Sequence, residues 1–143
     1  MAVPRAVMQS RGRRRISWKR FMGTLHAGCV LQNHVNPKKS TRVQRLLVDT
    51  GSDYTWIPQP VLKRIGVSEQ KRDLAFTMAN GQTITRSVGY AIIRVNGHFT
   101  IDEVVFAHPG DLSLLGARTL EGLNLRVDAK NKKLVAGGPL LAG

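Results

Sequence analysis

The sequence predicts a mainly β protein, folded as a single-lobe closed or sandwich-like barrel with one or two short helices. Three observations lead to this prediction. Short apolar runs recur along the chain, residues typical of turns separate them at regular spacing, and only two stretches have a helical pattern. At 143 residues with 42% hydrophobic side chains, the chain is long enough for one domain with a substantial core.

The first part of the chain is predicted to form a hairpin followed by a helix. Residues 22–31 and 43–48 have the apolar pattern of strands, and the turn-rich residues 36–40 connect them. A helix is predicted over residues 60–66, because a proline lies in its first turn and Gly66 lies where a C-terminal cap belongs.

Two Asn-Gly pairs, Asn80-Gly81 and Asn96-Gly97, predict hairpins in the middle of the chain. Both central positions of a two-residue hairpin turn need positive φ, which asparagine and glycine tolerate. The strands expected around these turns and the elements that follow are residues 75–78, 83–85, 87–95 and 99–106, a short helix over 117–122, and a last hairpin of 125–128 and 133–136.

The net charge of +13 belongs mainly to the N-terminal part of the chain. Residues 1–45 contain 11 Lys or Arg and no acid, whereas residues 46–143 contain the other 11 against all 9 acids. The single cysteine, Cys29, excludes an internal disulfide. His26 and His34 lie near it, but no second Cys or His pair completes a zinc spacing, so neither a metal site nor another cofactor is predicted. No apolar stretch approaches the ~20 residues that a membrane span requires.

Residues 1–21 are predicted to be a basic, disordered arm, because they have many Arg and little apolar periodicity. An Arg-rich, acid-free start also fits an organellar transit peptide or an arm that binds nucleic acid through phosphates, but a solvated tail is favoured. No apolar core follows that would make a secretory signal, so the predicted location is cytoplasmic or undetermined. Residues 22–136 form the predicted folded domain, and residues 137–143 a loose Gly/Pro-rich tail.

The chain is organised around an apolar run, residues 46–48, that ends on the carboxylate of Asp49 and continues with Thr50, Gly51 and Ser52. The run reads as a buried strand, and the glycine permits a tight loop directly after it. A carboxylate at the end of a buried strand is costly unless it is hydrogen-bonded, paired or used. The alternative is that Asp49 only caps a turn through its own side chain.

This loop resembles the active-site loop of the aspartic proteases. In its chain length, the protein is similar to the retropepsin-like branch of the family, of the small bacterial and archaeal type. The resemblance covers about residues 22–136 and rests on four features in the family's order. These are the Asp49-Thr50-Gly51-Ser52 loop, the hydrophobic segment 54–58, the polar hairpin tip 79–82, and Leu114-Leu115-Gly116 followed by the helix-like residues 117–122.

The resemblance implies an aspartic endopeptidase without a cofactor, whose substrate is a peptide or protein. Amide hydrolysis by carboxylates needs two of them, one ionised and one protonated. The chain contains one Asp-Thr-Gly and is too short for two lobes, so the second Asp49 must come from the partner of a C2 homodimer.

The resemblance also implies roles for the residues around Asp49. Thr50 matches the residue that hydrogen-bonds across the dimer axis, and Gly51 lets its backbone approach the dyad. Ser52 can donate a hydrogen bond to Asp49, which favours the charged carboxylate. A Ser52→Ala variant is therefore predicted to work at a less acidic pH than the native chain.

The hairpin tip is predicted to be the flap that covers the substrate, with Gly81 supplying flexibility. The substrate is expected to bind as an extra strand whose alternate side chains enter apolar pockets. The predicted flap residues are Met78, Ala79, Asn80 and Gly81, and the candidate pocket residues, which core packing explains equally well, are Ile57, Met78, Ile84 and Leu114.

The second signature of the family, Leu114-Leu115-Gly116, is expected to pack under the catalytic loop. Family members often have Arg directly after the glycine, paired with an Asp at the position of Asp53. Here Ala117 follows the glycine and the arginine is Arg118, so an Asp53–Arg118 pair at the dimer contact is a weaker expectation. The C-terminal hairpin, residues 125–136, is the first choice for the dimer strands.

Two other classes of function remain open. One is a non-catalytic relative with the retropepsin fold that binds peptides or oligomerises. The other is a nucleic-acid-associated protein that acts through basic residues 1–45, which is ranked last because few aromatic residues accompany the basic ones.

Overall fold

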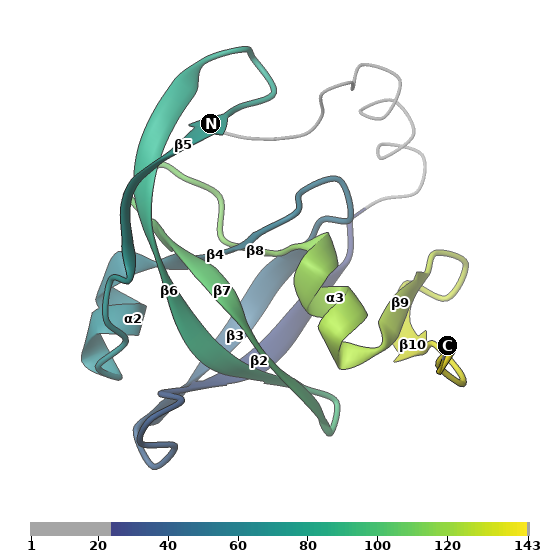
Figure 1. The fold of residues 1–143 in the computed structure, drawn as a ribbon. Coiled ribbons are helices and arrows are strands. Elements are labelled where there is room, and N and C mark those ends of the chain that lie inside the picture. Colours follow the sequence, from purple (N-terminus) through teal and green to yellow (C-terminus); the bar gives the residue numbers. More distant parts are fainter. Residues whose placement is uncertain (1–23, 143) are drawn as a thin grey trace.

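The computed structural model describes residues 24–142 and is mainly β, as the sequence predicts (Figure 1). The predicted arm, residues 1–21, lies outside the described residues. In chain order the elements are β2 (His26–Gln32), β3 (Ser40–Val48), β4 (Thr55–Pro58), α2 (Gln59–Arg64), β5 (Lys71–Thr77), β6 (Thr83–Val95), β7 (His98–Ala107), β8 (Leu114–Leu115), α3 (Ala117–Leu123), β9 (Leu125–Asp128) and β10 (Lys133–Ala136).

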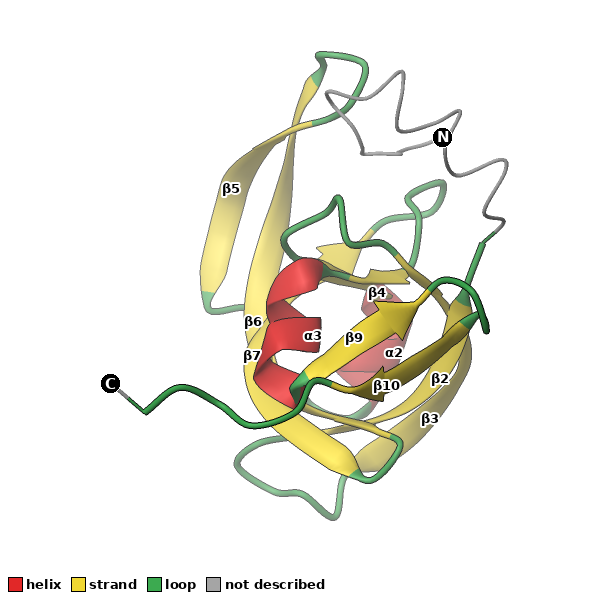
Figure 2. Ribbon diagram, turned by 90° about the vertical axis from the view of Figure 1, so that its right-hand side faces the viewer, coloured by secondary structure: helices red, strands yellow, loops and turns green. Residues whose placement is uncertain are grey.

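Seven of the strands form one curved sheet in the order β2-β3-β8-β4-β7-β6-β5 (Figure 1). The sheet is mostly antiparallel, but β8 runs parallel to β3, and β4 runs parallel to β7. Strand β2 also pairs with β6, so the sheet curls until strands near its two ends meet. Strands β9 and β10 form a separate two-stranded sheet beyond α3 (Figure 2).

The larger of two apolar clusters, called here the main cluster, fills the interior between the curled sheet and the two helices. Helix α2 contributes Leu62, and α3 contributes Leu120 and Leu123. The chemically distinct member is Cys29, a free thiol whose pKa burial raises to about 12. The buried members are Cys29, Leu31, Leu46, Val48, Ile57, Leu62, Ile65, Val67, Ala91, Ile93, Val95, Val104, Phe106, Leu115, Leu120, Leu123, Leu125 and Leu134.

A smaller second cluster lies around the β5–β6 hairpin. Its five buried members are surrounded by half-buried apolar side chains from three different parts of the chain. The buried members are Trp56, Val88, Val105, Ala107 and Leu114, and the half-buried rim consists of Leu47, Tyr54, Leu74, Phe76, Met78, Ile84 and Leu112.

Three elements differ in detail from the sequence-based expectations. Strand β6 is continuous from Thr83 to Val95, because its register with β5 passes directly into its register with β7. The predicted helix over 117–122 extends to Leu123 and ends at Asn124, which has the left-handed φ of 53°. Gly122 therefore lies inside the helix, where an added Cβ would come within 2.4 Å of Thr100 Oγ1.

The two Asn-Gly turns also differ from each other. Asn96 and Gly97 both have positive φ, as a two-residue hairpin turn requires. In the other turn only Gly81 has positive φ, and the Met78 amide donates to the carbonyl of Gln82. This loop thus contains three residues and ends on a left-handed glycine, and the Asn80 side chain accepts a hydrogen bond from the Gln82 amide instead.

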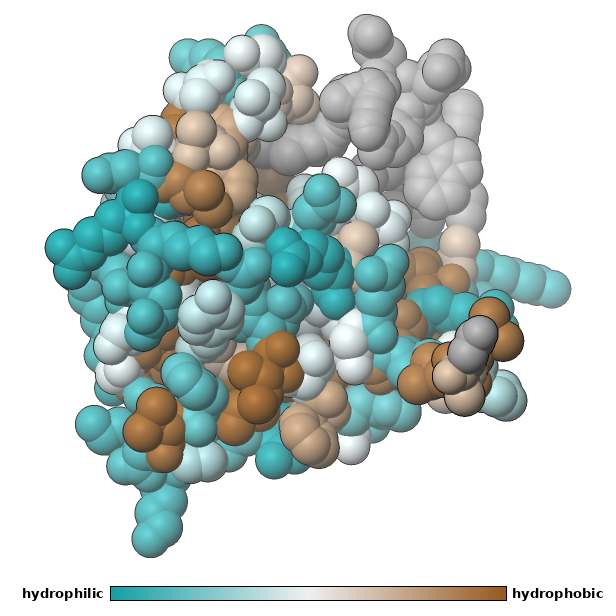
Figure 3. Space-filling model, viewed as in Figure 1, coloured by the Kyte–Doolittle hydropathy of each residue, from teal (hydrophilic) through white to brown (hydrophobic). Residues whose placement is uncertain are grey.

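Hydrophilic side chains cover most of the face shown in Figure 3, with smaller apolar groups between them. Among residues 24–142, no helix is both long enough and apolar enough to cross a membrane. The large apolar side chains that are exposed in this part of the chain are Val35, Phe99, Ile101, Leu140 and Leu141.

Candidate active site

Asp49 follows the last residue of β3 and is 1% exposed. Its amide donates to the carbonyl of Leu115 on β8 at 3.0 Å, so the second signature fixes the start of the loop. The Gly51 amide donates to Asp49 Oδ1 at 2.9 Å, and the Ser52 hydroxyl donates to Oδ2 at 3.2 Å. The loop therefore does more than turn the chain, because it aims two donors at one buried carboxylate.

The second signature packs under this loop, as the sequence predicts. Strand β8 lies between β3 and β4, with Leu115 beside Val48 and Leu114 beside Trp56. The amide of Ala117 donates to the carbonyl of Ser52 at 2.7 Å, which closes the far end of the loop.

Only glycine fits at position 116, because the surrounding backbone leaves no space for a side chain. An added Cβ would come within 2.3 Å of the Tyr54 carbonyl oxygen, which is closer than any real Cβ contact. Its amide donates to Thr55 Oγ1 at 3.0 Å, and Thr55 in turn contacts Thr119 Oγ1 at 2.5 Å. This buried chain of polar contacts joins the second signature and β4 to α3.

The predicted flap residues lie at the tip of the β5–β6 hairpin, which extends beyond the rest of the sheet (Figure 1). Met78 is half-buried in the rim of the second cluster, whereas Ala79, Asn80 and Gly81 are exposed. Of the candidate pocket residues, Met78 and Ile84 belong to this rim and Leu114 to its buried part. Ile57 is fully buried in the main cluster, so core packing explains that residue.

The rim of the second cluster is formed by three parts of the chain. Leu47 and Tyr54 flank the Asp49 loop in sequence, Phe76, Met78 and Ile84 come from the hairpin, and Leu112 comes from the segment before β8. Tyr54 and Phe76 pack edge to face with ring centroids 5.3 Å apart, and Phe76 also contacts Trp56. The arrangement offers half-buried apolar surface between the catalytic loop and the hairpin.

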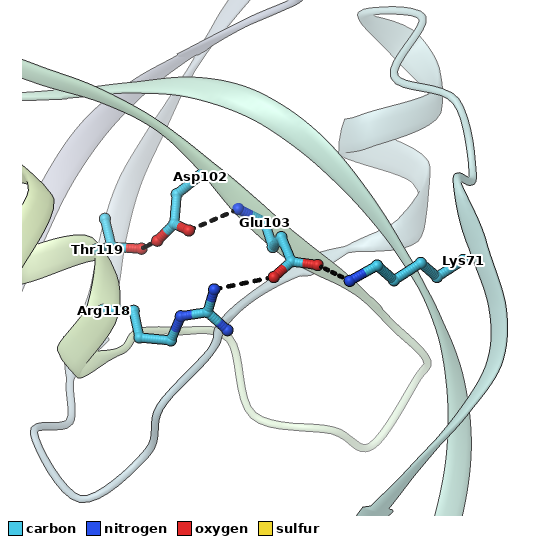
Figure 4. A network of polar contacts seen from close by, with 5 residues as sticks. All are labelled: Lys71, Asp102, Glu103, Arg118 and Thr119. Carbon is cyan, nitrogen blue, oxygen red and sulfur yellow. Dashed lines mark hydrogen bonds and ion pairs between the residues drawn. The ribbon is translucent and has the colours of Figure 1, made fainter.

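Within the chain, Arg118 is engaged by residues other than the Asp53 side chain. Its guanidinium donates to Glu103 Oε1 at 2.9 Å (Figure 4). The guanidinium also lies over the Tyr54 ring, 4.7 Å from the centroid. Asp53 is exposed, and its carbonyl accepts a hydrogen bond from the backbone amide of Arg118 at 3.1 Å. A pair between Asp53 and Arg118 of two different chains stays a prediction.

No pattern in the sequence predicted the network around Glu103, which Figure 4 shows. Its carboxylate also accepts a hydrogen bond from Lys71 Nζ at 2.6 Å. The hydrogen bonds from Lys71 and Arg118 outweigh burial and hold the pKa of Glu103 below its usual value. Next to it, Asp102 Oδ2 accepts from Thr119 Oγ1 at 2.9 Å. The local sequence pattern could predict that Glu103 lies on a strand. It could not predict that Lys71 and Arg118, which belong to other elements, would contact its carboxylate.

A second ion pair without a sequence signal joins Arg86 on β6 to Asp111 in the segment before β8. Burial favours the neutral carboxyl, but hydrogen bonds from Arg86 and from the His108 amide hold the pKa of Asp111 below its usual value. For metal binding, the described residues contain no group of three His, Cys, Asp or Glu side chains that could hold an ion.

Comparison with known families agrees with the geometry of the site. Residues 35–122, more than half of the chain, match the family model of the gag-polyprotein putative aspartyl protease. The matched range contains the Asp49 loop, the β5–β6 hairpin and the second signature. No curated protein matches the chain. The chain therefore belongs to the gag-polyprotein aspartyl protease family, a family of retropepsin-like aspartic proteases.

Proposed function

We propose that the protein is an aspartic endopeptidase that works as a C2 homodimer, in which Asp49 of each chain supplies one carboxylate of a catalytic dyad. The observation that carries this proposal is the Asp49 loop, where a buried carboxylate accepts hydrogen bonds from Gly51 and Ser52. A carboxylate this buried has a high cost for folding, and a catalytic role explains why the loop is built around it.

The chemistry follows from placing two such carboxyls about 3 Å apart, where they share one proton because both cannot ionise. The ionised carboxylate takes a proton from water as the water oxygen adds to the peptide carbonyl carbon. The protonated carboxyl gives its proton to the carbonyl oxygen, which becomes a hydroxyl of the tetrahedral intermediate. When the intermediate collapses, the dyad protonates the leaving nitrogen and takes a proton from one of the two hydroxyls, so a carboxylic acid forms and the dyad again holds one shared proton.

The substrate would bind as an extended strand between the catalytic loop and the β5–β6 hairpin. The flap residues Met78, Ala79, Asn80 and Gly81 would cover it and exclude water. The half-buried rim of the second cluster favours peptides with apolar side chains on both sides of the scissile bond.

Several features support a dimer of single-lobe barrels. The pairing of β2 with β6 supports a closed barrel in each subunit. Thr50 is exposed at the tip of the catalytic loop, where a second chain could meet it. Within the described residues neither outer edge of the β9–β10 sheet has a strand partner, and Leu140 and Leu141 after it are 75% and 100% exposed. Open strand edges and exposed leucines favour this sheet as the dimer contact.

The test is cleavage of a diverse peptide pool between pH 4 and 7, read by mass spectrometry, with native chain and Asp49→Asn side by side. Loss of a group that transfers protons in the transition state is expected to lower kcat by at least about a hundredfold. Glu121→Gln, which removes an exposed carboxylate on α3, is the matched control and should cleave normally. No cleavage by the native chain, with a dimer present in solution, would favour the peptide-binding module instead.

A mixing experiment tests the shared dyad directly. If each site needs Asp49 from two chains, a roughly tenfold excess of the Asp49→Asn chain should lower activity per native chain to about a tenth, because most native chains then meet an inactive partner. Activity that does not change on mixing, under conditions where subunits exchange, would contradict a dyad built from two chains.

A further inference from the structure

The Arg86–Asp111 ion pair connects two segments that border the candidate substrate cleft, which is the space between the Asp49 loop and the β5–β6 hairpin. These two segments are the hairpin itself and segment 108–113. Arg86 Nε donates to Asp111 Oδ2 at 2.7 Å, and Nη2 donates to Oδ1 at 2.8 Å. Arg86 lies on β6, three residues after the strand leaves the predicted flap, and Asp111 lies three residues before the second signature begins at Leu114. The pair therefore connects the hairpin that carries the flap to the segment that leads into the catalytic framework.

The geometry of the pair is that of a rigid link. Two parallel N–H···O bonds fix the orientation of both side chains as well as their separation. The side chains are only 15% and 12% exposed, so water screens the pair less than a pair on the surface. Each side chain has a further hydrogen bond, since Arg86 Nη1 donates to the Thr85 carbonyl and the His108 amide donates to Asp111 Oδ2.

At its end next to β8, segment 108–113 is tied to β3 by a hydrogen bond of 3.4 Å from the Leu47 amide to the Ser113 carbonyl. His108, Pro109 and Gly110 are exposed, and a cleft of about 580 Å³ runs along this segment and the start of α2. On the opposite side, Leu112 is the residue that packs into the rim of the second cluster. Because packing holds the segment on one side only, the ion pair is well placed to decide how far Leu112 lies from the hairpin.

We propose that Arg86 and Asp111 are positioning residues that clamp the β5–β6 hairpin to segment 108–113, and thereby set the width of the substrate cleft and the choice of substrate side chain between Ile84 and Leu112. This role rests on the proposed protease function for its effect on substrates. The clamp itself is a property of the fold. The depressed pKa of Asp111 supports it, since the carboxylate then stays charged at mildly acidic pH.

Hydrogen exchange tests the clamp without any need for activity. Asp111→Asn and Arg86→Met should each speed amide exchange at least about tenfold in two regions. These are segment 108–113 and the hairpin amides of Met78 and Gly81. Without the ion pair, both segments should open locally more often. Arg72→Met, which removes an exposed cation of an i,i+3 pair on β5, is the matched control and should leave both regions unchanged. Faster exchange in 108–113 alone would overturn the clamp, since the pair would then act only on its own segment.

Peptide cleavage tests the consequence for substrates. A looser cleft is expected to raise KM about tenfold with little change in kcat, and to broaden the preference for one substrate side chain, because the dyad is intact and only positioning is lost. Arg86→Lys keeps the positive charge but cannot make the bidentate contact. Its KM and its cleavage preference should lie between those of the native chain and those of Arg86→Met. Unchanged KM and cleavage preference would overturn the role in specificity. If the native chain cleaves nothing, the proposed protease function fails, whereas hydrogen exchange still decides the clamp.

Discussion

The main cluster and the second cluster share strands β4, β6, β7 and β8, yet they are built differently. Side chains on one face of these strands, such as Ile57, Ile93 and Leu115, are fully buried in the main cluster. Side chains on the other face, such as Trp56 and Leu114, reach the second cluster, whose rim is only half-buried. One set of strands therefore supplies a sealed core on one side and an incompletely covered apolar surface on the other.

The polar contacts around the two clusters differ in the same way. The second cluster is bordered by charged contacts, Arg86–Asp111 at one side and Glu103 with Lys71 and Arg118 at another. Apolar burial holds the main cluster, whereas ion pairs help to hold the segments around the second. An open apolar surface provides less burial, so directional contacts must fix its walls. The comparison teaches that one face of these strands is buried for stability, whereas the opposite face leaves the apolar surface where we propose that the substrate binds.

The sharpest way to test the comparison is one substitution at two positions of β6. Ile93→Ala removes a fully buried side chain from the main cluster and should lower the free energy of unfolding by about 2–5 kcal/mol. Urea denaturation monitored by circular dichroism measures this loss. A loss below about 1 kcal/mol would mean that the main cluster is not the principal source of stability.

Ile84→Ala makes the same change in the rim of the second cluster, where the side chain is half-buried. The expected loss of unfolding free energy is smaller, about 1 kcal/mol, because less apolar surface is withdrawn from water. Activity should respond more strongly than stability, with a raised KM for peptides. If Ile84→Ala destabilises the fold as much as Ile93→Ala, the proposed division between the two faces is wrong.

Glu103→Gln should have the smallest effect and should depend on pH. The pKa of Glu103 is lowered in the folded state, so its contribution to stability is fully present above the ordinary value of 4.5 and is lost as pH falls through the folded value. The difference in unfolding free energy between native chain and variant should therefore be largest near neutral pH and shrink below about pH 4.5. Denaturation curves at a series of pH values measure it, and Glu121→Gln provides the comparison for an exposed glutamate. A difference that grows on acidification would contradict the assigned pairing.

Much of the site could be predicted from the sequence because its signals are local. The Asp49 loop, the second signature and the hairpins are each encoded within a few residues, and the structure brings the first two together as expected. Two details of the local expectations differ from the structure. The turn at Asn80 gained a third residue, and Gly122 serves close packing against Thr100 rather than ending a helix.

The sequence by itself determined the strand-rich fold, the position of the Asp49 loop and the single copy of its Asp-Thr-Gly, since turns, periodicity and spacing act between near neighbours. Only the tertiary structure decided which face of each strand is sealed and which cation meets which carboxylate. Arg86 and Asp111 are 25 residues apart in the chain, and Lys71 and Glu103 are 32 apart. Such pairs depend on the register between strands and on the direction of each side chain, which no local pattern specifies.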